Sequence, residues 1–248
     1  MTRVKGILTI VLCTLLLISC SATKEKVDAG EVHYILGVSY LRENNPTLAL
    51  KEFLIAYNSE DSGRVHSGLG QAYQLKRAFK EAEEHYKAAL RRDEDNPQFA
   101  NNLAALYLDM GRWDAAIKYF NQAADNLLFT TPEIALTGLG VAYYQKGEYL
   151  QAIIQFEKSI NLAPRFAQTY YHLGETYFAL DKPDLALFQL NHAIDLSPAY
   201  AGAYYKRALT YLKLKNNVAA RADFMRVLAL VPDNEIGRLS KDYLRLLK

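Results

Sequence analysis

The side chains that most often perform proton transfer or metal binding are sparse in this chain of 248 residues. His172 and Glu175 stand three residues apart, which would place both on one face of a helix. Nucleophilic or acid–base catalysis needs a further group that activates or orients such a pair, and the sequence shows none. No histidine pair has the HExxH spacing, and neither a P-loop nor a Gly-x-Ser-x-Gly elbow occurs. We therefore expect neither an enzyme nor a cofactor or metal site.

Cys20 is the residue for which the sequence predicts a definite chemical modification. Arg3 and Lys5 form a charged start, and an apolar run follows at residues 7–18 that is too short to span a bilayer as a helix. The run ends in Leu17-Ile18-Ser19-Cys20, which resembles a bacterial lipobox. A plain signal peptide that happens to end near a cysteine is the alternative. The resemblance implies cleavage before Cys20 and acylation of its thiol.

These features divide the N-terminal region into two predicted parts. Residues 1–19 form a lipoprotein signal peptide, and residues 20–29 form a polar, lipidated tether. Several acyl chains suffice for stable attachment to a membrane. Ser21, rather than aspartate, resembles lipoproteins that are passed on to the outer membrane. The expected location is therefore the periplasmic side of the outer membrane, with the N-terminal lipid as the anchor.

The charge balance argues against nucleic acid as a partner. The chain has 29 Lys and Arg residues against 27 Asp and Glu residues. Arg3 and Lys5 would leave with the signal peptide, so the mature chain would be neutral. A nucleic-acid-binding protein instead needs a basic face. With only two cysteines, no disulfide framework or cysteine zinc cluster is expected.

The rest of the chain repeats one pattern six times. It is clearest at residues 139–164, where Leu-Gly-x-x-Tyr, Gly-x-Tyr, Ala-x-x-x-Phe and Pro follow in the order of a tetratricopeptide helix–turn–helix. Each copy has a small residue and, three residues later, a tyrosine, followed by a second small residue and, four residues later, a large apolar one. By repeat they are Gly37, Tyr40, Ala49 and Phe53; Gly70, Tyr73, Ala82 and Tyr86; Ala104, Tyr107, Ala116 and Phe120; Gly140, Tyr143, Ala152 and Phe156; Gly174, Tyr177, Ala186 and Leu190; and Ala208, Tyr211, Ala220 and Phe224.

The pattern predicts an all-α fold, a right-handed α-α superhelix of six tetratricopeptide repeats over residues 30–232. The first small residue lets the two helices of a pair approach closely, and the large second-helix residue packs onto the next repeat. His33 and His66 share one repeat position, which favours packing over metal binding. Residues 233–248 are expected to form a C-terminal capping helix. Its apolar stripe is Ile236, Leu239, Tyr243, Leu246 and Leu247.

The link between the third and fourth repeats is longer than the period requires. It contains Leu127, Leu128 and Phe129, and then Thr131-Pro132-Glu133, which is typical of the start of a helix. We expect the apolar trio to wedge between adjacent repeats. Exposed contact with a partner is the alternative, so both the groove and residues 125–132 are candidate binding sites.

Tetratricopeptide arrays bind partners through fixed first-helix positions that line their concave face. Here these positions are aromatic, aliphatic and amide-rich, which suits an extended or helical apolar segment of a protein partner. Carboxylate-clamp versions of the fold need lysine and arginine, but Arg42, Arg64 and Lys213 are scattered. The predicted groove residues are Tyr34, Val38, Leu41, Gln71, Asn102, Leu108, Val141, Tyr144, Tyr171, Glu175, Phe178 and Tyr205.

A lipobox followed by six such repeats resembles the type IV pilus biogenesis and stability lipoproteins, the PilF/PilW family of pilotins. The matching residues are Cys20, Leu36-Gly37 and Tyr40-Leu41 in the first repeat, and Asn101-Asn102-Leu103-Ala104 in the third. The resemblance implies an outer-membrane lipoprotein that binds secretin subunits and assists their assembly in type IV pilus biogenesis. A lipidated scaffold would raise the effective concentration of a bound subunit at the membrane. The alternative is a general periplasmic scaffold lipoprotein for envelope assembly or polysaccharide export.

Overall fold

The computed structural model describes residues 29–247, and all regular structure in this range is helical. The helices pack as consecutive antiparallel pairs, which confirms the predicted all-α array of six repeats with a capping helix. The predicted signal peptide, Cys20 and the tether up to residue 28 lie outside the described residues. The pairs are α2 (Ala29–Arg42) with α3 (Pro46–Ser59), α4 (Gly63–Leu75) with α5 (Phe79–Arg92), α6 (Pro97–Asp109) with α7 (Trp113–Ala124), α8 (Pro132–Gln145) with α9 (Tyr149–Leu162), α10 (Ala167–Ala179) with α11 (Pro183–Leu196) and α12 (Ala201–Lys213) with α13 (Asn217–Leu230), and α14 (Glu235–Leu246) follows.

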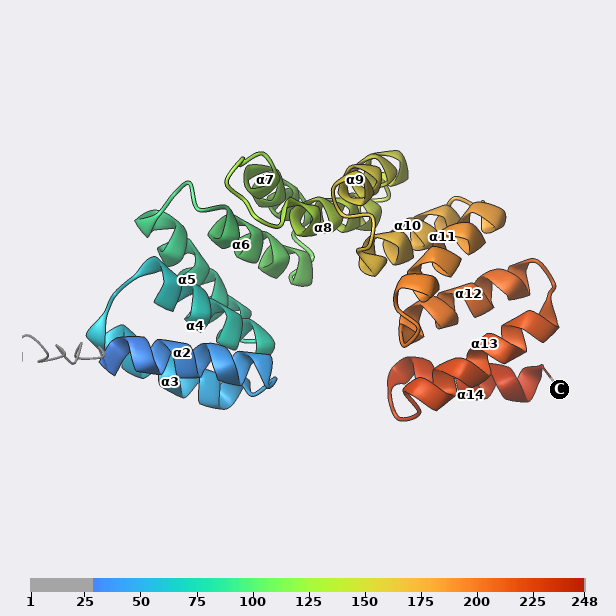
Figure 1. Ribbon diagram of the computed structural model, residues 1–248, viewed down its shortest axis with the longest axis horizontal. Helices are drawn as coiled ribbons and strands as arrows, with labels where there is room; N and C mark the ends of the chain where they lie inside the picture. Colours follow the sequence, from blue (N-terminus) through green and yellow to red (C-terminus); the bar gives the residue numbers. More distant parts are fainter. Residues whose placement is uncertain (1–28, 248) are drawn as a thin grey trace, which may run out of the picture.

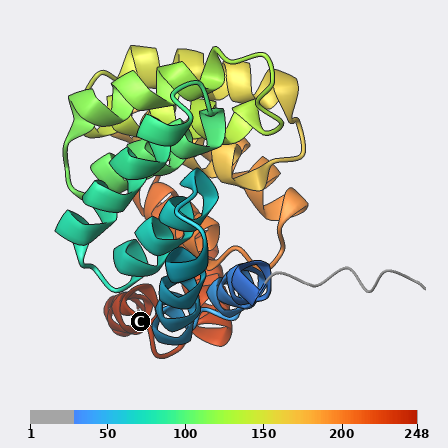
Figure 2. The same ribbon diagram turned by 90° about the vertical axis from the view of Figure 1, so that its left-hand side faces the viewer.

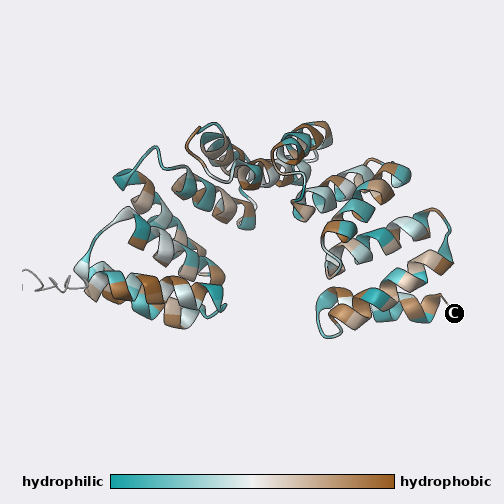
Figure 3. Cartoon of the chain, in the orientation of Figure 1, coloured by the Kyte–Doolittle hydropathy of each residue, from teal (hydrophilic) through white to brown (hydrophobic). Residues whose placement is uncertain are grey.

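The helix pairs are arranged in an arc, with α2 and α3 at one end and α13 and α14 at the other (Figures 1 and 2). Each first helix contacts the first helix of the next pair, whereas no two second helices in the described part of the chain contact each other. The first helices are therefore the closer-spaced layer and line the inner side of the arc, as α6, α8 and α10 do in Figure 1. Apolar stretches are spread over all the helices (Figure 3), as expected when each repeat buries its apolar face against its neighbours.

The turn within every pair contains one residue in the left-handed backbone conformation. The N–H of the residue that follows it donates to the carbonyl of the repeated tyrosine, five residues earlier, at 2.8 or 2.9 Å, and so closes the first helix. Glycine adopts this conformation without steric cost, yet only the third and fourth repeats have glycine there. The six residues are Asn44, Arg77, Gly111, Gly147, Asp181 and Lys215.

The core of each pair depends on a close approach between the two helices. A Cβ atom on Gly140 would lie 2.4 Å from the ring of Phe156, and one on Gly37 would lie 2.6 Å from the ring of Phe53. Phe53 also packs on the next repeat, because a Cβ atom on Gly68 would lie 2.6 Å from the same ring. Both phenylalanines are fully buried. The predicted roles of the small and large residues are therefore confirmed.

The capping helix α14 packs against α12 and α13. The rings of Tyr243 and Phe224 stack with their centroids 4.7 Å apart. The predicted stripe is right for Tyr243 and Leu247 but wrong for Leu239 and Leu246, which are exposed. Leu244, which the stripe left out, packs instead. A helix that covers only one end of an array leaves its far side to solvent. Within residues 29–247, no helix combines the length and apolarity needed to cross a membrane.

Candidate partner-binding groove

The predicted groove residues all lie on the first helices of their pairs, and every one is intermediate between buried and fully exposed. Their side chains therefore reach the inner side of the arc while part of each packs on a neighbour. They are Tyr34, Val38 and Leu41 on α2, Gln71 on α4, Asn102 and Leu108 on α6, Val141 and Tyr144 on α8, Tyr171, Glu175 and Phe178 on α10, and Tyr205 on α12.

A pocket of about 450 Å³ lies between α2, α4 and α6. It brings together Tyr34, Val38, Leu41 and Gln71, which come from two repeats. A smaller pocket of about 330 Å³ shares Leu41 and Gln71 with it and continues along the inner surface. Apolar walls with an amide at the junction fit a protein segment that places apolar side chains in the pockets and donates or accepts main-chain hydrogen bonds.

The charge of Arg64, one of two arginines at the first pocket, is balanced by neighbouring carboxylates. Arg64 forms ion pairs with Glu60, at 2.8 Å, and with Glu31, and its guanidinium lies 4.8 Å from the centroid of the Tyr34 ring. The hydrogen bonds to Glu60 and Glu31 raise the pKa of Arg64 above its ordinary value. Arg42 also lines the pocket and forms no ion pair with a described residue. The pocket therefore presents one uncommitted positive charge at its edge.

Asn102 connects the first pocket to the rest of the groove. Its side-chain NH₂ donates to Ser67 Oγ at 3.0 Å, and its Oδ1 accepts from Gln98 at 2.9 Å. A further pocket of about 340 Å³ lies between α6, α8 and α10, where Leu108 and Val141 meet. The inner surface of the first four repeats is thus a row of apolar pockets separated by amides.

The predicted groove residues on α10 form more ion pairs and ring contacts with neighbouring residues than those on α2 and α4 do. Glu175 pairs with Lys206 Nζ at 3.0 Å and with His172 Nδ1 at 3.2 Å, and its side chain is 17% exposed. Burial alone would raise the pKa of Glu175, but the hydrogen bond from His172 and the charge of Lys206 outweigh it, so the pKa lies below its ordinary value. The sequence showed no third group beside His172 and Glu175, and the structure supplies Lys206 from α12.

Aromatic side chains fill the space around this ion pair. The centroid of the Tyr171 ring lies 4.9 Å from that of Tyr200, and burial followed by the charge of Glu175 raises the pKa of Tyr171. Two ammonium groups lie over the Phe178 ring, with Lys206 Nζ 5.5 Å and Lys213 Nζ 4.9 Å from its centroid. This part of the inner surface is consequently more charged and more closely packed than the predicted apolar groove.

Two other predicted tyrosines also make ring contacts. Tyr205 packs its ring 5.9 Å from that of Phe224, and Tyr144 lies 5.5 Å from Tyr149. Both contacts join the first and second helices of one repeat. These residues contribute to packing as well as to the inner surface.

His66 is buried, as its repeat position predicted, and it forms a polar cluster between α4 and α5. Its Nε2 lies 2.8 Å from Asp61 Oδ1, and its Nδ1 lies 2.8 Å from Nδ1 of His85. His33, at the same position in the first repeat, pairs with Glu52 at 2.6 Å. In the described part of the chain, no three His, Cys, Asp or Glu side chains are placed to hold a metal ion.

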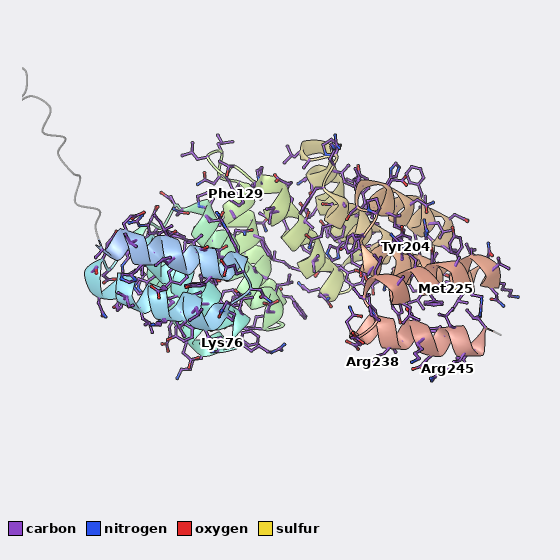
Figure 4. All side chains as sticks on the ribbon, turned by 60° about the horizontal axis from the view of Figure 1, so that its bottom comes forward. Lys76, Phe129, Tyr204, Met225, Arg238 and Arg245 are labelled. Atoms are coloured by element: carbon purple, nitrogen blue, oxygen red, sulfur yellow. The ribbon has the colours of Figure 1, made fainter. Side chains whose placement is uncertain are left out.

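The link between α7 and α8 does not behave as one apolar wedge. Phe129, which Figure 4 labels, is buried, but Leu127 and Leu128 are 99% and 85% exposed. The expectation that all three pack between repeats is therefore wrong for the two leucines. The link of residues 125–131 directs only some of its side chains inward, and the two consecutive leucines face solvent. The start of α8 at Pro132 is as predicted.

Sequence reasoning missed several residues that line the first pocket. Phe53 was assigned to the core, but its ring also forms a wall of the pocket, together with Phe99 from the third pair. Gln98 and Ser67 complete it and hold Asn102. No single repeat signals these contributions, because the pocket forms only where three consecutive first helices meet.

Models of the tetratricopeptide repeat match residues 36–98, 97–165, 167–200 and 201–234. Together these matches extend over nearly the whole helical array. The chain therefore belongs to the tetratricopeptide-repeat proteins, a class of protein-binding scaffolds rather than of enzymes.

Within this class the chain resembles the PilF/PilW type IV pilus assembly factors. It is 26% identical over 140 residues to the type IV pilus assembly protein PilF of Pseudomonas aeruginosa, which is 56% of this chain and 56% of PilF. It is also 26% identical over 121 residues to the human intraflagellar transport protein 88 homolog, of which it spans only 14%. The alignments thus extend over about half of PilF and a small part of the human protein.

Solved structures show the same fold. The crystal structure of PilW, a widely conserved type IV pilus biogenesis factor, superposes with a TM-score of 0.77 at 19% identity and covers 85% of this chain and 97% of PilW. The structure of Pseudomonas aeruginosa PilF has a TM-score of 0.72, also at 19% identity, and covers 86% of this chain. At this identity the structural likeness describes the arrangement of helices and not the partner.

Proposed function

We propose that this chain is an outer-membrane lipoprotein that binds a secretin subunit in its inner groove and assists secretin assembly in type IV pilus biogenesis. The alignment with PilF carries the proposal, because PilF is named for pilus assembly and the match extends over 140 residues. The lipobox-like sequence that ends at Cys20 supports the membrane location.

The groove supports recognition of an apolar protein segment. Four predicted residues from α2 and α4 meet in one pocket, and Gln71 lies where this pocket joins the next. A segment that places an apolar side chain between Tyr34 and Phe99 would bring its backbone to the Gln71 amide. An acidic side chain of the same segment would meet Arg42, the uncommitted cation of the pocket.

A co-purification experiment tests this proposal directly. The full chain is co-expressed with the secretin encoded by its own organism. The amount of secretin that co-purifies is then compared between the wild type, Gln71→Arg and Gln151→Arg. We expect Gln71→Arg to abolish recovery, because an arginine would fill the shared wall of two pockets. Gln151 lies exposed on α9, outside the groove, so Gln151→Arg should bind as the wild type does.

The Cys20→Ala variant separates location from recognition. It should still bind the secretin subunit but should leave the secretin monomeric or in the wrong membrane. Equal secretin recovery with Gln71→Arg and Gln151→Arg would place the contact outside the groove. Recovery of only peptidoglycan enzymes or polysaccharide-export proteins would instead support the general envelope scaffold.

A further inference from the structure

The α7–α8 connection presents Leu127 and Leu128 to solvent on an anchored turn. The N–H of Leu128 donates to Asn126 Oδ1 at 2.8 Å, and the N–H of Phe129 donates to the Asn126 carbonyl at 3.0 Å. Phe129 is 7% exposed and packs into the core formed by α5 to α8. The two leucines, which we call the leucine knob, are therefore held outward by a buried neighbour and a hydrogen-bonded turn.

A groove of about 420 Å³ lies between the second helices α5 and α7. Leu90 and Tyr119 are its apolar lining, Lys87, Arg91 and Lys118 are its basic lining, and Glu94 and Gln122 complete it. We call it the outer groove, because α5 and α7 are second helices and do not belong to the inner side of the arc. Lys118 Nζ lies 5.0 Å over the Tyr119 ring, and Arg91 forms no ion pair with a described residue.

Two side-chain bonds join the outer groove to the knob. Gln122, which lines the groove, donates to the Glu94 carbonyl at 2.9 Å. One helical turn further on, Asn126 donates to the Asp95 carbonyl at 2.8 Å. Because Lys118, Gln122 and Asn126 follow at intervals of four, they share one side of α7 and its extension. Asn126, at the base of the knob, consequently lies on the same side of α7 as the outer groove.

The two features have opposite charge. Asp95 and Asp125 flank the base of the knob, are exposed and form no ion pair with any residue between 29 and 247. The outer groove carries Arg91 and Lys118 against one acidic lining residue, Glu94. An apolar knob with an acidic base is thus matched by an apolar groove with a mainly basic lining. An anionic bilayer would repel the two carboxylates, whereas the basic side chains in the groove of another copy complement them.

We propose that the occupant of the outer groove is the leucine knob of a second copy of this chain. Since the base of the knob and the outer groove share one side of α7, a two-fold axis between the copies joins both pairs at once. The contact uses second helices and a loop, so the inner grooves of both copies stay open. The assembly would present two partner-binding grooves, and the proposal does not depend on which partner they bind.

Sedimentation velocity of the full chain in detergent, over a range of concentrations, tests the proposal. The knob variant carries Leu127→Asp and Leu128→Asp, and the groove variant carries Arg91→Glu and Lys118→Glu. We expect a concentration-dependent dimer for the wild type. The dissociation constant of the knob variant should rise by roughly tenfold for each leucine removed. Val218→Asp, at an 83% exposed position on α13, is the matched control and should leave the dimer intact.

A mixture of the two variants gives the sharper result. Each variant alone lacks both complete contacts, but a mixed dimer retains one knob in one intact groove. We expect the mixture to dimerise when neither variant does, with unchanged melting temperatures because all four side chains are exposed.

Three results would overturn the proposal. The first is a monomer at every concentration, and the second is a dimer that survives both sets of substitutions. The third is a monomer whose Cys20→Ala form floats with phosphatidylethanolamine–phosphatidylglycerol vesicles only when both leucines are present.

Discussion

The Nδ1 atoms of His66 on α4 and His85 on α5 lie 2.8 Å apart, so one ring donates a hydrogen bond to the other. Nε2 of His66 lies 2.8 Å from Asp61 Oδ1, and a carboxylate can only accept. His66 therefore carries its proton on Nε2, and its Nδ1 accepts from His85 Nδ1. Both rings are neutral in this arrangement. A second proton on His66, at its Nδ1, would place two donors face to face inside the second repeat.

The histidine pair should make the protein less stable in mild acid. Burial, and then the charge of Arg92, lower the pKa of His66, while burial and then His66 lower the pKa of His85. A base with a lowered folded pKa takes up protons in the unfolded state first. Its contribution is complete above the unfolded value of about 6.5 and declines as the pH falls below it.

Urea unfolding between pH 7.5 and pH 5.5 checks this expectation. The free energy of unfolding should fall by up to about 1.4 kcal/mol per pH unit for each histidine held neutral. His85→Gln should flatten the slope, whereas His192→Gln, at an exposed position, should not. Identical slopes for His85→Gln and the wild type would refute the role of the pair. The chosen window lies above the range in which carboxylates titrate.

Lys215→Gly should stabilise the protein. Lys215 has φ +60° in the turn between α12 and α13, and a non-glycine residue in this conformation costs about 1 kcal/mol. Gly147, with φ +78°, is the reciprocal case, and a Cβ atom there meets nothing within 4 Å. Gly147→Ala should therefore lose about 1 kcal/mol for backbone reasons alone. Thermal unfolding that moves both variants in the same direction would contradict this account.

Gly140→Ala should destabilise the fourth repeat. The new Cβ atom would lie 2.4 Å from the buried ring of Phe156, which has no space to retreat. We expect a loss of about 1–3 kcal/mol in urea unfolding, although alanine is the better helix former. Gly202→Ala on α12 is the control. Its Cβ atom would lie 3.3 Å from the edge of the Tyr200 ring, so the better helix propensity should prevail there.

Glu175 and Lys206 should show coupled effects on stability. Glu175→Gln leaves the Lys206 ammonium without its partner in a half-buried site, at an expected cost of about 1–2 kcal/mol. Lys206→Met alone should have a similar effect, and the double variant should lose much less than the sum. A double-mutant cycle by chemical unfolding measures this coupling. Strict additivity would show that the pair contributes nothing beyond its separate side chains.

Phe129 and Leu128 should respond oppositely to truncation despite being neighbours. Phe129→Ala should cost about 3–5 kcal/mol, because the ring is buried in the core between the third and fourth repeats. Leu128→Ala should change the stability by less than about 0.5 kcal/mol, because the side chain lies in solvent. Melting temperatures of the two variants decide the matter. Equal losses would mean that Leu128 has a packing partner in solution.

The sequence predicted the apolar part of the inner surface but not its ion pairs. Tyr34, Val38, Leu41 and Gln71 line one pocket, because positions that recur at the repeat period share one side of the array. Glu175 has the same repeat position as Gln71, but Glu175 forms an ion pair with Lys206 from the next repeat. The repeat pattern carries no information on such a pair, since the ammonium and the carboxylate are brought together by the stacking of α10 on α12.

The sequence by itself determined the number of repeats, the ends of the helices and the contact between small residues and large rings. Each of these follows from short-range spacing, because a repeat buries its apolar face mainly against its own pair and the next. Only the tertiary structure decided that Phe129 enters the core while Leu127 and Leu128 leave it, and that His66 and His85 share a hydrogen bond. The physical reason is that a turn and the angle between stacked pairs, not residue type, choose which side chains meet and which face solvent.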